Sequence, residues 1–336
     1  VSKSGGDTID GNLTVDGDIT TEGIVATDGL DITGDTSITG DTVITGNLEF
    51  TGTITPAYPI VSNANILINP SFTVQQRGAV INHTSSTLKF GPDRWKFRGV
   101  PNVGGSLVRT STVLDATTGV NKLKVETSGA TSYGYTYQFV EAVNLQGLYG
   151  GEITFSFGYS DSGSGDPKVN LISYDSGGTP KTLFDAVPTD LGGGRWSCTV
   201  TLSTDDGTFP DLTASGMRVQ IYPNEGNTAP DEWYVWETKL EAGSEVTLFI
   251  ARPYGEELSL CQRYAQVTKL IATDNPSTQW ASWLLPVVMR AAPTITNQSA
   301  DNPSVTPSYN SNEGMMWQSN SVSTTATVTF TLDAEL

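Results

Sequence analysis

The sequence holds one histidine and two cysteines, so the usual base and the thiol nucleophiles of covalent catalysis are few. A Ser-His-Asp or Cys-His site could use only His83 as its base. Nothing near His83 resembles a nucleophile elbow or a zinc-binding helix. We therefore predict a surface-loop position for His83, and no catalytic residues.

Carboxylates are abundant, and two acidic side chains can in principle cleave a glycosidic bond. With 36 Asp and Glu residues, closeness in the sequence carries little information about such a pair. Asp161 and Asp166 flank a Gly- and Ser-rich loop and could offer oxygen ligands to a structural calcium ion, without the spacing of an EF-hand. A hydrated hairpin turn is the simpler interpretation. We expect no cofactor, with calcium as the alternative.

Aromatic rings are the expected contacts if the chain binds a sugar, since flat rings stack on sugar faces. Tyr133, Tyr135 and Tyr137 alternate along one predicted strand and therefore share a face, which is either core or exposed. Trp233 and Trp236 differ in parity, so one of the two should point outward. Tyr133 and Tyr135 are our candidate ligand contacts in this region.

Three further tryptophans lie near the C-terminus among Ser, Asn, Thr and Gln residues. Such polar neighbours favour exposure, and apolar rings rimmed by hydrogen-bonding groups are typical of a binding patch. The competing explanation is that these rings close a subunit axis. The candidate ligand contacts of this stretch are Trp280, Trp283 and Trp317.

The charge balance restricts the partners, because 36 acidic residues against 18 basic ones give a formal net charge of -18. Repulsion from phosphates argues against nucleic-acid binding through a basic face. A neutral or weakly charged partner, such as a glycan, fits better. No apolar run approaches the roughly 18 residues that a membrane span needs. We expect neither a nucleic-acid partner nor membrane insertion.

Two cysteines cannot build a disulfide framework. Cys198 lies in a strand-like stretch and Cys261 in a predicted helix. Small apolar burial is the usual fate of a free cysteine, so we expect two buried thiols. Free thiols fit assembly in a reducing cytoplasm.

The first fifty-odd residues repeat, with a glycine at every fifth or sixth position. Ile32, Ile38 and Ile44 recur in phase within successive Ile-Thr-Gly units, and short periods of this kind indicate fibrous β structure. One such ribbon cannot bury its isoleucines alone, whereas three chains could place them on a common axis. We predict that residues 1–60 form an intertwined trimeric β stalk with these isoleucines as its core. The alternative is a flexible polar linker.

Beyond the repeat the pattern changes at Pro56-Ala57-Tyr58-Pro59. Up to about residue 252, short alternating strands are separated by Gly, Asp, Ser and Pro clusters, which is typical of a sandwich or jelly roll. The sequence thus predicts an all-β protein: a fibrous stalk, a jelly-roll β-sandwich over residues 61–254, and a small C-terminal β domain.

One convincing helix is predicted at residues 254–264. Glu256 and Glu257 occupy its first turn, where the helix dipole favours negative charge. Leu258, Cys261 and Ala265 follow i, i+3, i+7 spacing and should share one face. Strand-and-turn composition returns after it, so residues 255–336 are predicted to be a short helix followed by a small β tip domain.

Several stretches resemble fibre proteins of tailed bacteriophages. The most specific is Gly255-Glu256-Glu257-Leu258 followed by Cys261-Gln262-Arg263-Tyr264. Pro92-Asp93-Arg94-Trp95 is similar to a signature of a β domain widespread in these fibres, and Val74 departs from it where a tryptophan is common. Further matching pieces lie at residues 3–13, 69–78, 239–244, 249–254, 286–294 and 333–336.

The resemblance implies a jelly roll similar to carbohydrate-binding modules, in which Trp95 and Trp196 pack in the core. Such modules often hold a structural calcium ion. It also implies a homotrimeric appendage on the virion surface, assembled in the bacterial cytoplasm and joined to other virion proteins through a part preceding this sequence.

Our prediction is a non-catalytic receptor-binding fibre, on the tail or the capsid, that attaches the virion to host surface glycans. Recognition is expected in the two C-terminal β units, with the residues after Gly255 as the tip. The alternatives are a purely structural decoration fibre and, third, a polysaccharide depolymerase.

Overall fold

The chain divides into two units, Val1–Ile54 and Thr55–Leu336. The computed structural model describes parts of the second unit, and the predicted stalk with Ile32, Ile38 and Ile44 lies outside the described residues. The described residues are 64–78, 80–83, 89–100, 108–127, 133–162, 165–174, 179–202, 216–223, 232–272, 279–300, 305–319 and 326–335.

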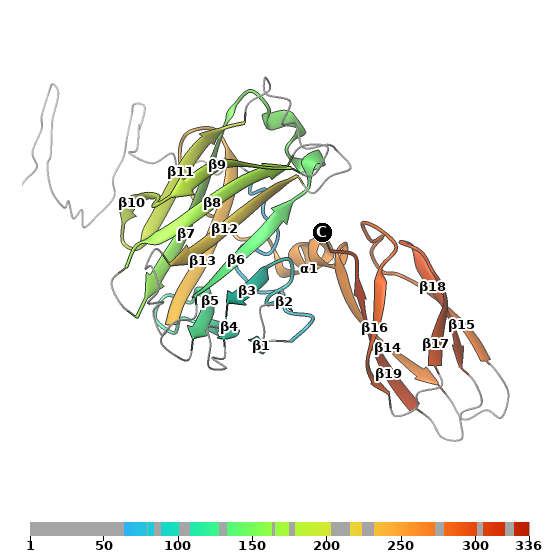
Figure 1. Ribbon diagram of the computed structural model, residues 1–336. Helices are drawn as coiled ribbons and strands as arrows, with labels where there is room; N and C mark the ends of the chain where they lie inside the picture. The colour runs from blue at the N-terminus through green and yellow to red at the C-terminus, as the bar shows by residue number, and fades with distance from the viewer. Residues whose placement is uncertain are drawn as a thin grey trace, which may run out of the picture. The chain divides into compact units, whose positions relative to one another are not determined.

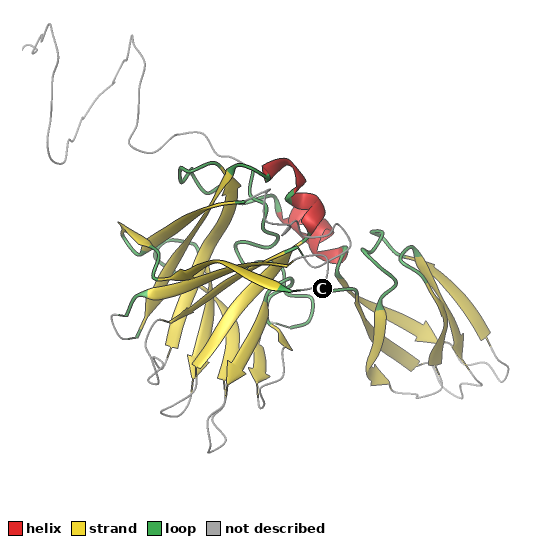
Figure 2. Ribbon diagram, turned by 45° about the horizontal axis from the view of Figure 1, so that its top comes forward, coloured by secondary structure: helices red, strands yellow, loops and turns green. Residues whose placement is uncertain are grey.

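Two antiparallel sheets face each other across a hydrophobic core and form a β-sandwich (Figure 1). Strands account for nearly all of the regular structure, and helix is confined to short segments (Figure 2). The seven-stranded sheet runs, in spatial order, β1 (Val80–His83), β4 (Val108–Leu114), β5 (Asn121–Thr127), β13 (Glu232–Ala242), β7 (Glu152–Asp161), β11 (Arg195–Thr201) and β10 (Thr189–Gly192). The six-stranded sheet runs β2 (Lys89–Phe90), β3 (Lys96–Val100), β6 (Tyr133–Val140), β12 (Met217–Pro223), β8 (Pro167–Tyr174) and β9 (Pro180–Ala186).

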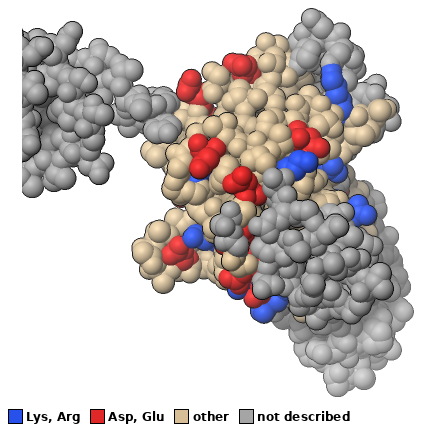
Figure 3. All heavy atoms as spheres, turned by 60° about the vertical axis from the view of Figure 1, so that its left-hand side comes forward, with Lys and Arg blue, Asp and Glu red and all other residues tan. Residues whose placement is uncertain are grey.

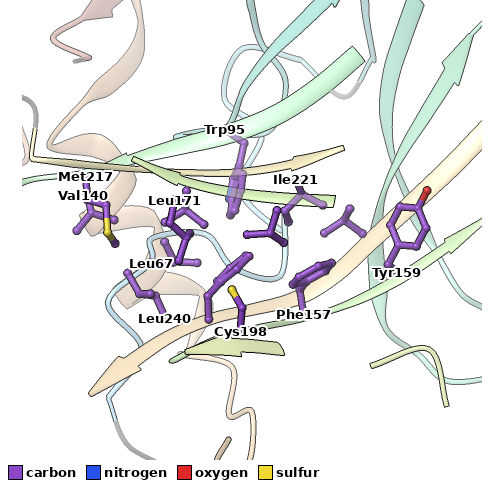
Figure 4. Close-up of a cluster of buried hydrophobic side chains, with 14 of the residues drawn as sticks. Leu67, Trp95, Val140, Phe157, Tyr159, Leu171, Cys198, Met217, Ile221 and Leu240 are labelled. Atoms are coloured by element: carbon purple, nitrogen blue, oxygen red, sulfur yellow. The ribbon is translucent and has the colours of Figure 1, made fainter. Parts of the chain in front are cut away.

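The core lies between these two sheets, because successive side chains of a strand point to opposite faces and one face of each sheet is apolar. Trp95, Phe157, Cys198 and Met217 meet there, as Figure 4 shows. Burying each large apolar side chain contributes about 1.5–3 kcal/mol. The predicted β-sandwich is therefore confirmed, with Trp95 inside the core and Trp196 half-buried against it.

Two short 3₁₀ helices, η1 (Ala142–Asn144) and η2 (Gln146–Leu148), join β6 to β7. The predicted helix is α1 (Tyr254–Gln262), with Cys261 buried and Leu258 packed beside it. Ala265 was expected on the same helix and that was wrong, because it begins β14 and pairs with Asp333. Strand pairing here overrides local helix preference.

Two three-stranded sheets follow α1. One contains β14 (Ala265–Ala272), β19 (Ala326–Asp333) and β16 (Thr294–Ala300), and the other β15 (Gln279–Leu284), β18 (Gly314–Ser319) and β17 (Val305–Asn310). The predicted division at residues 60 and 254 stays a prediction. No helix among the residues described by the structure is both long and apolar enough to cross a membrane.

The C-terminal strand is tied to the sandwich by a buried ion-pair network. The guanidinium of Arg77 lies 3.4 Å from Glu335 and 3.6 Å from Asp93, and Arg94 forms an ion pair with Glu335 as well. Arg94 also lies over the ring of Tyr264, 3.5 Å from its centroid. Residues from four distant parts of the sequence therefore meet in one cluster.

Asp93 gives this network a pH dependence. Burial raises the pKa of its carboxyl above the usual value, against the opposing effect of Arg77. A raised pKa means that ionised Asp93 costs stability, and that this cost disappears as the pH falls through the folded pKa. Relative to D93N, the parent should therefore gain free energy of unfolding as the pH falls from neutral. Urea unfolding of both proteins measures this, and a difference that stays constant or moves toward D93N contradicts it.

Cys198 and Cys261 are both buried and free, as the sequence predicts. They belong to separate apolar clusters, Cys198 between the two sheets and Cys261 on α1. Burial raises the pKa of the Cys198 thiol to about 12, and it raises the pKa of Cys261 too. Both thiols are therefore protonated and unreactive in the fold.

Candidate functional site

The outer face of the six-stranded sheet carries a row of aromatic residues on its strand β6. Thr136 and Gln138 of this strand are buried on the core side. Their neighbours Tyr135, Tyr137 and Phe139 point to the opposite side, because side chains alternate along a strand. We call this outer surface, with its neighbours on β3, β8, β9 and β12, the aromatic face.

The rings of the aromatic face form one connected cluster. Tyr137 lies 5.9 Å from Tyr135 and 5.5 Å from Phe139, the latter edge-on at 88°. Phe139 in turn lies 5.8 Å from Tyr174 of β8. Tyr137 is only 3% exposed and forms the floor, whereas the other three rings are half-buried. The surrounding rings are therefore the ones that a ligand could touch.

Polar side chains from the two neighbouring strands extend this row. In the sheet register, Gln220 of β12 lies between Tyr137 of β6 and Asn170 of β8. Gln220 is 7% exposed, and neither its Oε1 nor the Oδ1 of Asn170 has a hydrogen-bond partner in the part of the chain that the structure describes. Buried acceptors without a donor are uncommon and call for a physical explanation.

Cationic groups complete the aromatic face. The guanidinium of Arg218 lies over the ring of Tyr137, 5.6 Å from its centroid, and its buried Nε has no hydrogen-bond partner within the described ranges. Arg98 donates from Nη1 to the hydroxyl of Tyr135 at 3.3 Å. Burial raises the pKa of Tyr137, so its phenol stays neutral.

The described strands of the aromatic face carry one carboxylate, and protein groups already engage it. Asp185 of β9 forms an ion pair of 3.1 Å with Lys168 and accepts a hydrogen bond of 2.9 Å from the hydroxyl of Tyr222. Tyr222 adds another half-buried ring. Flat rings beside unpaired amide oxygens and a guanidinium can bind a ring-shaped ligand rich in hydroxyl groups.

Of the two ligand contacts predicted in the sandwich, one is placed on the aromatic face. Tyr135 belongs to it, whereas the side chain of Tyr133 lies outside the described residues. Sequence reasoning missed the polar groups. Alternation along residues 217–222, which puts Arg218, Gln220 and Tyr222 on one side, is the signal that could have found them.

For the C-terminal tryptophans the structure gives the strand and its pairing. Trp283 of β15 pairs with Met315 of β18, and Ala281 with Trp317. Nothing is described of the side chains of Trp280, Trp283 and Trp317, so their role as ligand contacts stays a prediction.

Two other expectations concern single residues. His83 was expected in a loop and instead ends strand β1, because it pairs with Val108 of β4. Asp161 ends β7 and accepts hydrogen bonds from Tyr159 and Gly165, while Asp166 is exposed. Among the residues that are described, no group of three His, Cys, Asp or Glu side chains could hold a metal ion. A calcium ion at Asp161 and Asp166 stays an expectation.

Of the two tryptophans on β13, Trp233 lies in the core and Trp236 on the outer side, as their parity predicts. The space beneath Trp236 depends on Gly158, where a Cβ would lie 2.0 Å from the indole. Outside the aromatic face, most charged side chains of the described residues form ion pairs, and Figure 3 shows some acidic and basic groups next to one another on one side of the molecule.

No family model matches the chain, and no curated protein matches it. The enzymatically active domain of tailspike protein 4 from bacteriophage CBA120 is similar over 53% of this chain and 21% of that one, at 7% identity and a TM-score of 0.32. The chain thus spans about a fifth of that tailspike structure.

Two further solved structures are similar over about half of the chain. The CBM22-1 xylan-binding domain of Xyn10C from Paenibacillus barcinonensis covers 55% of this chain and 98% of its own, at 13% identity and a TM-score of 0.30. The xyloglucanase domain of NopAA from Sinorhizobium fredii covers 48% and 98%, at 13% identity and a TM-score of 0.29. At these scores the likeness assigns neither a ligand nor an activity.

Proposed function

We propose that this chain is a trimeric phage fibre protein that attaches the virion to a host surface glycan through the aromatic face, without catalysis. The observation that carries the proposal is Gln220, whose buried Oε1 has no hydrogen-bond partner in the described residues although it lies beside an aromatic cluster.

A sugar fits these groups because its ring has an apolar face and a rim of hydroxyl groups. The half-buried rings of Tyr135, Phe139, Tyr174 and Tyr222 can stack against the apolar face. An unsatisfied buried acceptor costs about 1–3 kcal/mol, and a sugar hydroxyl that donates to Gln220 relieves this cost. A bound sugar would therefore supply the hydrogen bond that Gln220 lacks in the described structure.

We prefer attachment over cleavage because the described strands of the aromatic face do not supply the two carboxylates that cleavage needs. Glycoside hydrolases use two carboxylates that flank the bond to be cleaved. On the described part of the aromatic face there is Asp185, and an ion pair with Lys168 together with the Tyr222 hydroxyl already engages it.

The virion role rests on the resemblance of the sequence to tailed-phage fibres. A trimeric stalk would present three copies of the aromatic face on one appendage. Linked sites raise the overall avidity by orders of magnitude over that of one site, which suits weak sugar contacts. A purely structural decoration fibre is the alternative.

Replacing Gln220 by Met tests the binding face. Methionine keeps the length of the side chain and removes an acceptor that has no partner in the described fold, so Q220M should melt at or slightly above the parent temperature. Its affinity for the glycan should fall about tenfold, as expected from losing one hydrogen bond of about 1.4 kcal/mol. An array of bacterial surface glycans identifies the strongest binder, and titration calorimetry with that glycan measures the affinity.

Gln138 provides the matched control, since it is a glutamine on the adjacent strand that points inward. Its amide accepts from the backbone N–H of Ile68 at 2.9 Å and donates to the carbonyl of Ile68 at 2.7 Å. Q138M should therefore lose stability and bind normally once folded. Parent-like binding by Q220M would overturn the aromatic face as the site, and a parent that binds no glycan would favour the decoration fibre.

A further inference from the structure

We infer that the glycan is acidic and that Arg218 binds its carboxylate; this inference rests on the proposed function of the aromatic face and names the class of its ligand. The sequence-based expectation was a neutral or weakly charged glycan.

The first observation is that most of the other described cations form an ion pair. In a chain with 36 acidic and 18 basic residues, most cations find a carboxylate partner. Eleven of those in the described residues do so: Arg77, Arg94, Arg109, Lys122, Lys124, Lys168, Arg195, Lys239, Arg252, Arg263 and Arg290.

Arg218 differs from these residues. No carboxylate of the described residues forms an ion pair with it, and among these residues its side chain contacts the ring of Tyr137. Its buried Nε is left without a hydrogen-bond partner among them. Since a partly buried donor on a charged group is costly to leave unpaired, a ligand atom is the natural acceptor.

The position of Arg218 suits a sugar acid. It lies two residues before Gln220 on β12, and two residues along a strand span roughly 6.6 Å. In the register Arg218 is opposite Phe139 on one side and Ile172 on the other. One sugar residue stacked on Phe139 could therefore meet Arg218 with its carboxylate and Gln220 with a hydroxyl.

The guanidinium geometry favours a carboxylate. Its planar fork presents parallel N–H donors that match the two oxygens of a carboxylate, and such charge-assisted bonds are about twice as strong as neutral ones. The guanidinium carbon of Arg218 lies 5.6 Å from the centroid of the Tyr137 ring, so the cation stays over the aromatic face.

The net charge of -18 does not oppose this contact at close range. Charges more than about 8 Å apart are largely screened at physiological ionic strength. A carboxylate on the aromatic face meets Arg218 directly, whereas Asp185 is neutralised by Lys168. Local complementarity decides the ligand class, and the overall charge mainly slows the approach of polyanions.

The experiment compares a glycan with its carboxyl-reduced form. An array of neutral and acidic bacterial glycans is probed with the full chain, and the strongest acidic binder is titrated before and after its carboxyl groups are reduced to alcohols. We expect the strongest binders to be acidic, and reduction to weaken binding about tenfold. R218Q should lose about tenfold for the acidic glycan and nothing for the reduced form, with R218K in between.

Arg109 serves as the charge-matched control, because it lies on the other sheet and its side chain is 51% exposed. R109Q changes the net charge equally and should bind like the parent. The inference is overturned if the strongest binders are neutral, or if R218Q weakens the acidic and the reduced glycan by the same factor. In either case a loss of binding by Q220M would leave the proposed function standing, whereas a silent array would overturn both.

Discussion

Alanine at Trp95 is expected to lower the free energy of unfolding by about 3–5 kcal/mol, the cost typical of removing a buried tryptophan. Trp95 is 1% exposed, and its ring packs against Phe72 with centroids 5.1 Å apart. The indole Nε1 also donates a hydrogen bond of 2.9 Å to the carbonyl of Asn69. W95A thus leaves a cavity and removes one of the two donors to the Asn69 carbonyl, which keeps the backbone N–H of Phe72.

Phenylalanine at the same position separates these two effects. W95F keeps most of the ring volume and loses the N–H, so its cost should be smaller, about 1–3 kcal/mol. Urea unfolding followed by circular dichroism measures both variants. A loss below about 1 kcal/mol for W95A would show that Trp95 does not pack in the core in the way that its burial and its contact with Phe72 indicate.

Several of the motifs that resemble those of tailed-phage fibres contact one another around Asn69. The amide side chain of Asn69 donates to the backbone of Val74 and of Asp93, and the backbone N–H of Asn69 donates to Glu257 of α1. The motifs thus converge on one structural cluster. They specify the framework of the fold and none of the groups of the aromatic face.

The fold was accessible from the sequence because period-two alternation and Gly- and Pro-rich turns are local signals. Pairing order was not, since β13 lies between β5 and β7 through contacts that are distant in sequence. The end of α1 was misplaced for the same reason: Ala265 leaves the helix to pair with Asp333, some seventy residues away.

The candidate site was predicted less well. Tyr135 could be found from alternation, but whether its face was core or outside depended on which side Gln138 and Val140 occupy. Arg218 and Gln220 are candidate ligand contacts because each has a buried polar atom without a hydrogen-bond partner in the described structure. The absence of a hydrogen-bond partner cannot be predicted from the sequence. Only the assembled sheet brings them beside Tyr137.

Methionine at Lys239 is the second substitution with a large expected effect, again about 3–5 kcal/mol. Lys239 and Glu241 form an ion pair of 3.1 Å on the outer side of β13, where their side chains are 1% and 0% exposed. The register of β13 against β7 shifts between Trp236 and Lys239, so the two faces of the strand are exchanged beyond this point. Leu240 therefore lies in the core, and both charged side chains lie on the outer side.

The segment after β13 buries the pair. The backbone N–H of Thr247 donates to Glu241 at 3.0 Å, and the ammonium of Lys239 donates to the carbonyl of Leu248 at 2.9 Å. K239M removes the cation and leaves the Glu241 carboxylate buried without its counter-charge. This uncompensated charge, rather than the lost attraction, causes most of the expected loss.

The double variant tests this explanation. In K239M/E241L no charge remains in the cluster, so about half or more of the loss should be recovered, although Thr247 still lacks the acceptor for its N–H. Urea unfolding of the single and double variants forms a thermodynamic cycle. If K239M costs less than about 1 kcal/mol, or if the double variant is less stable than K239M, the pair is not buried in the way that its geometry requires.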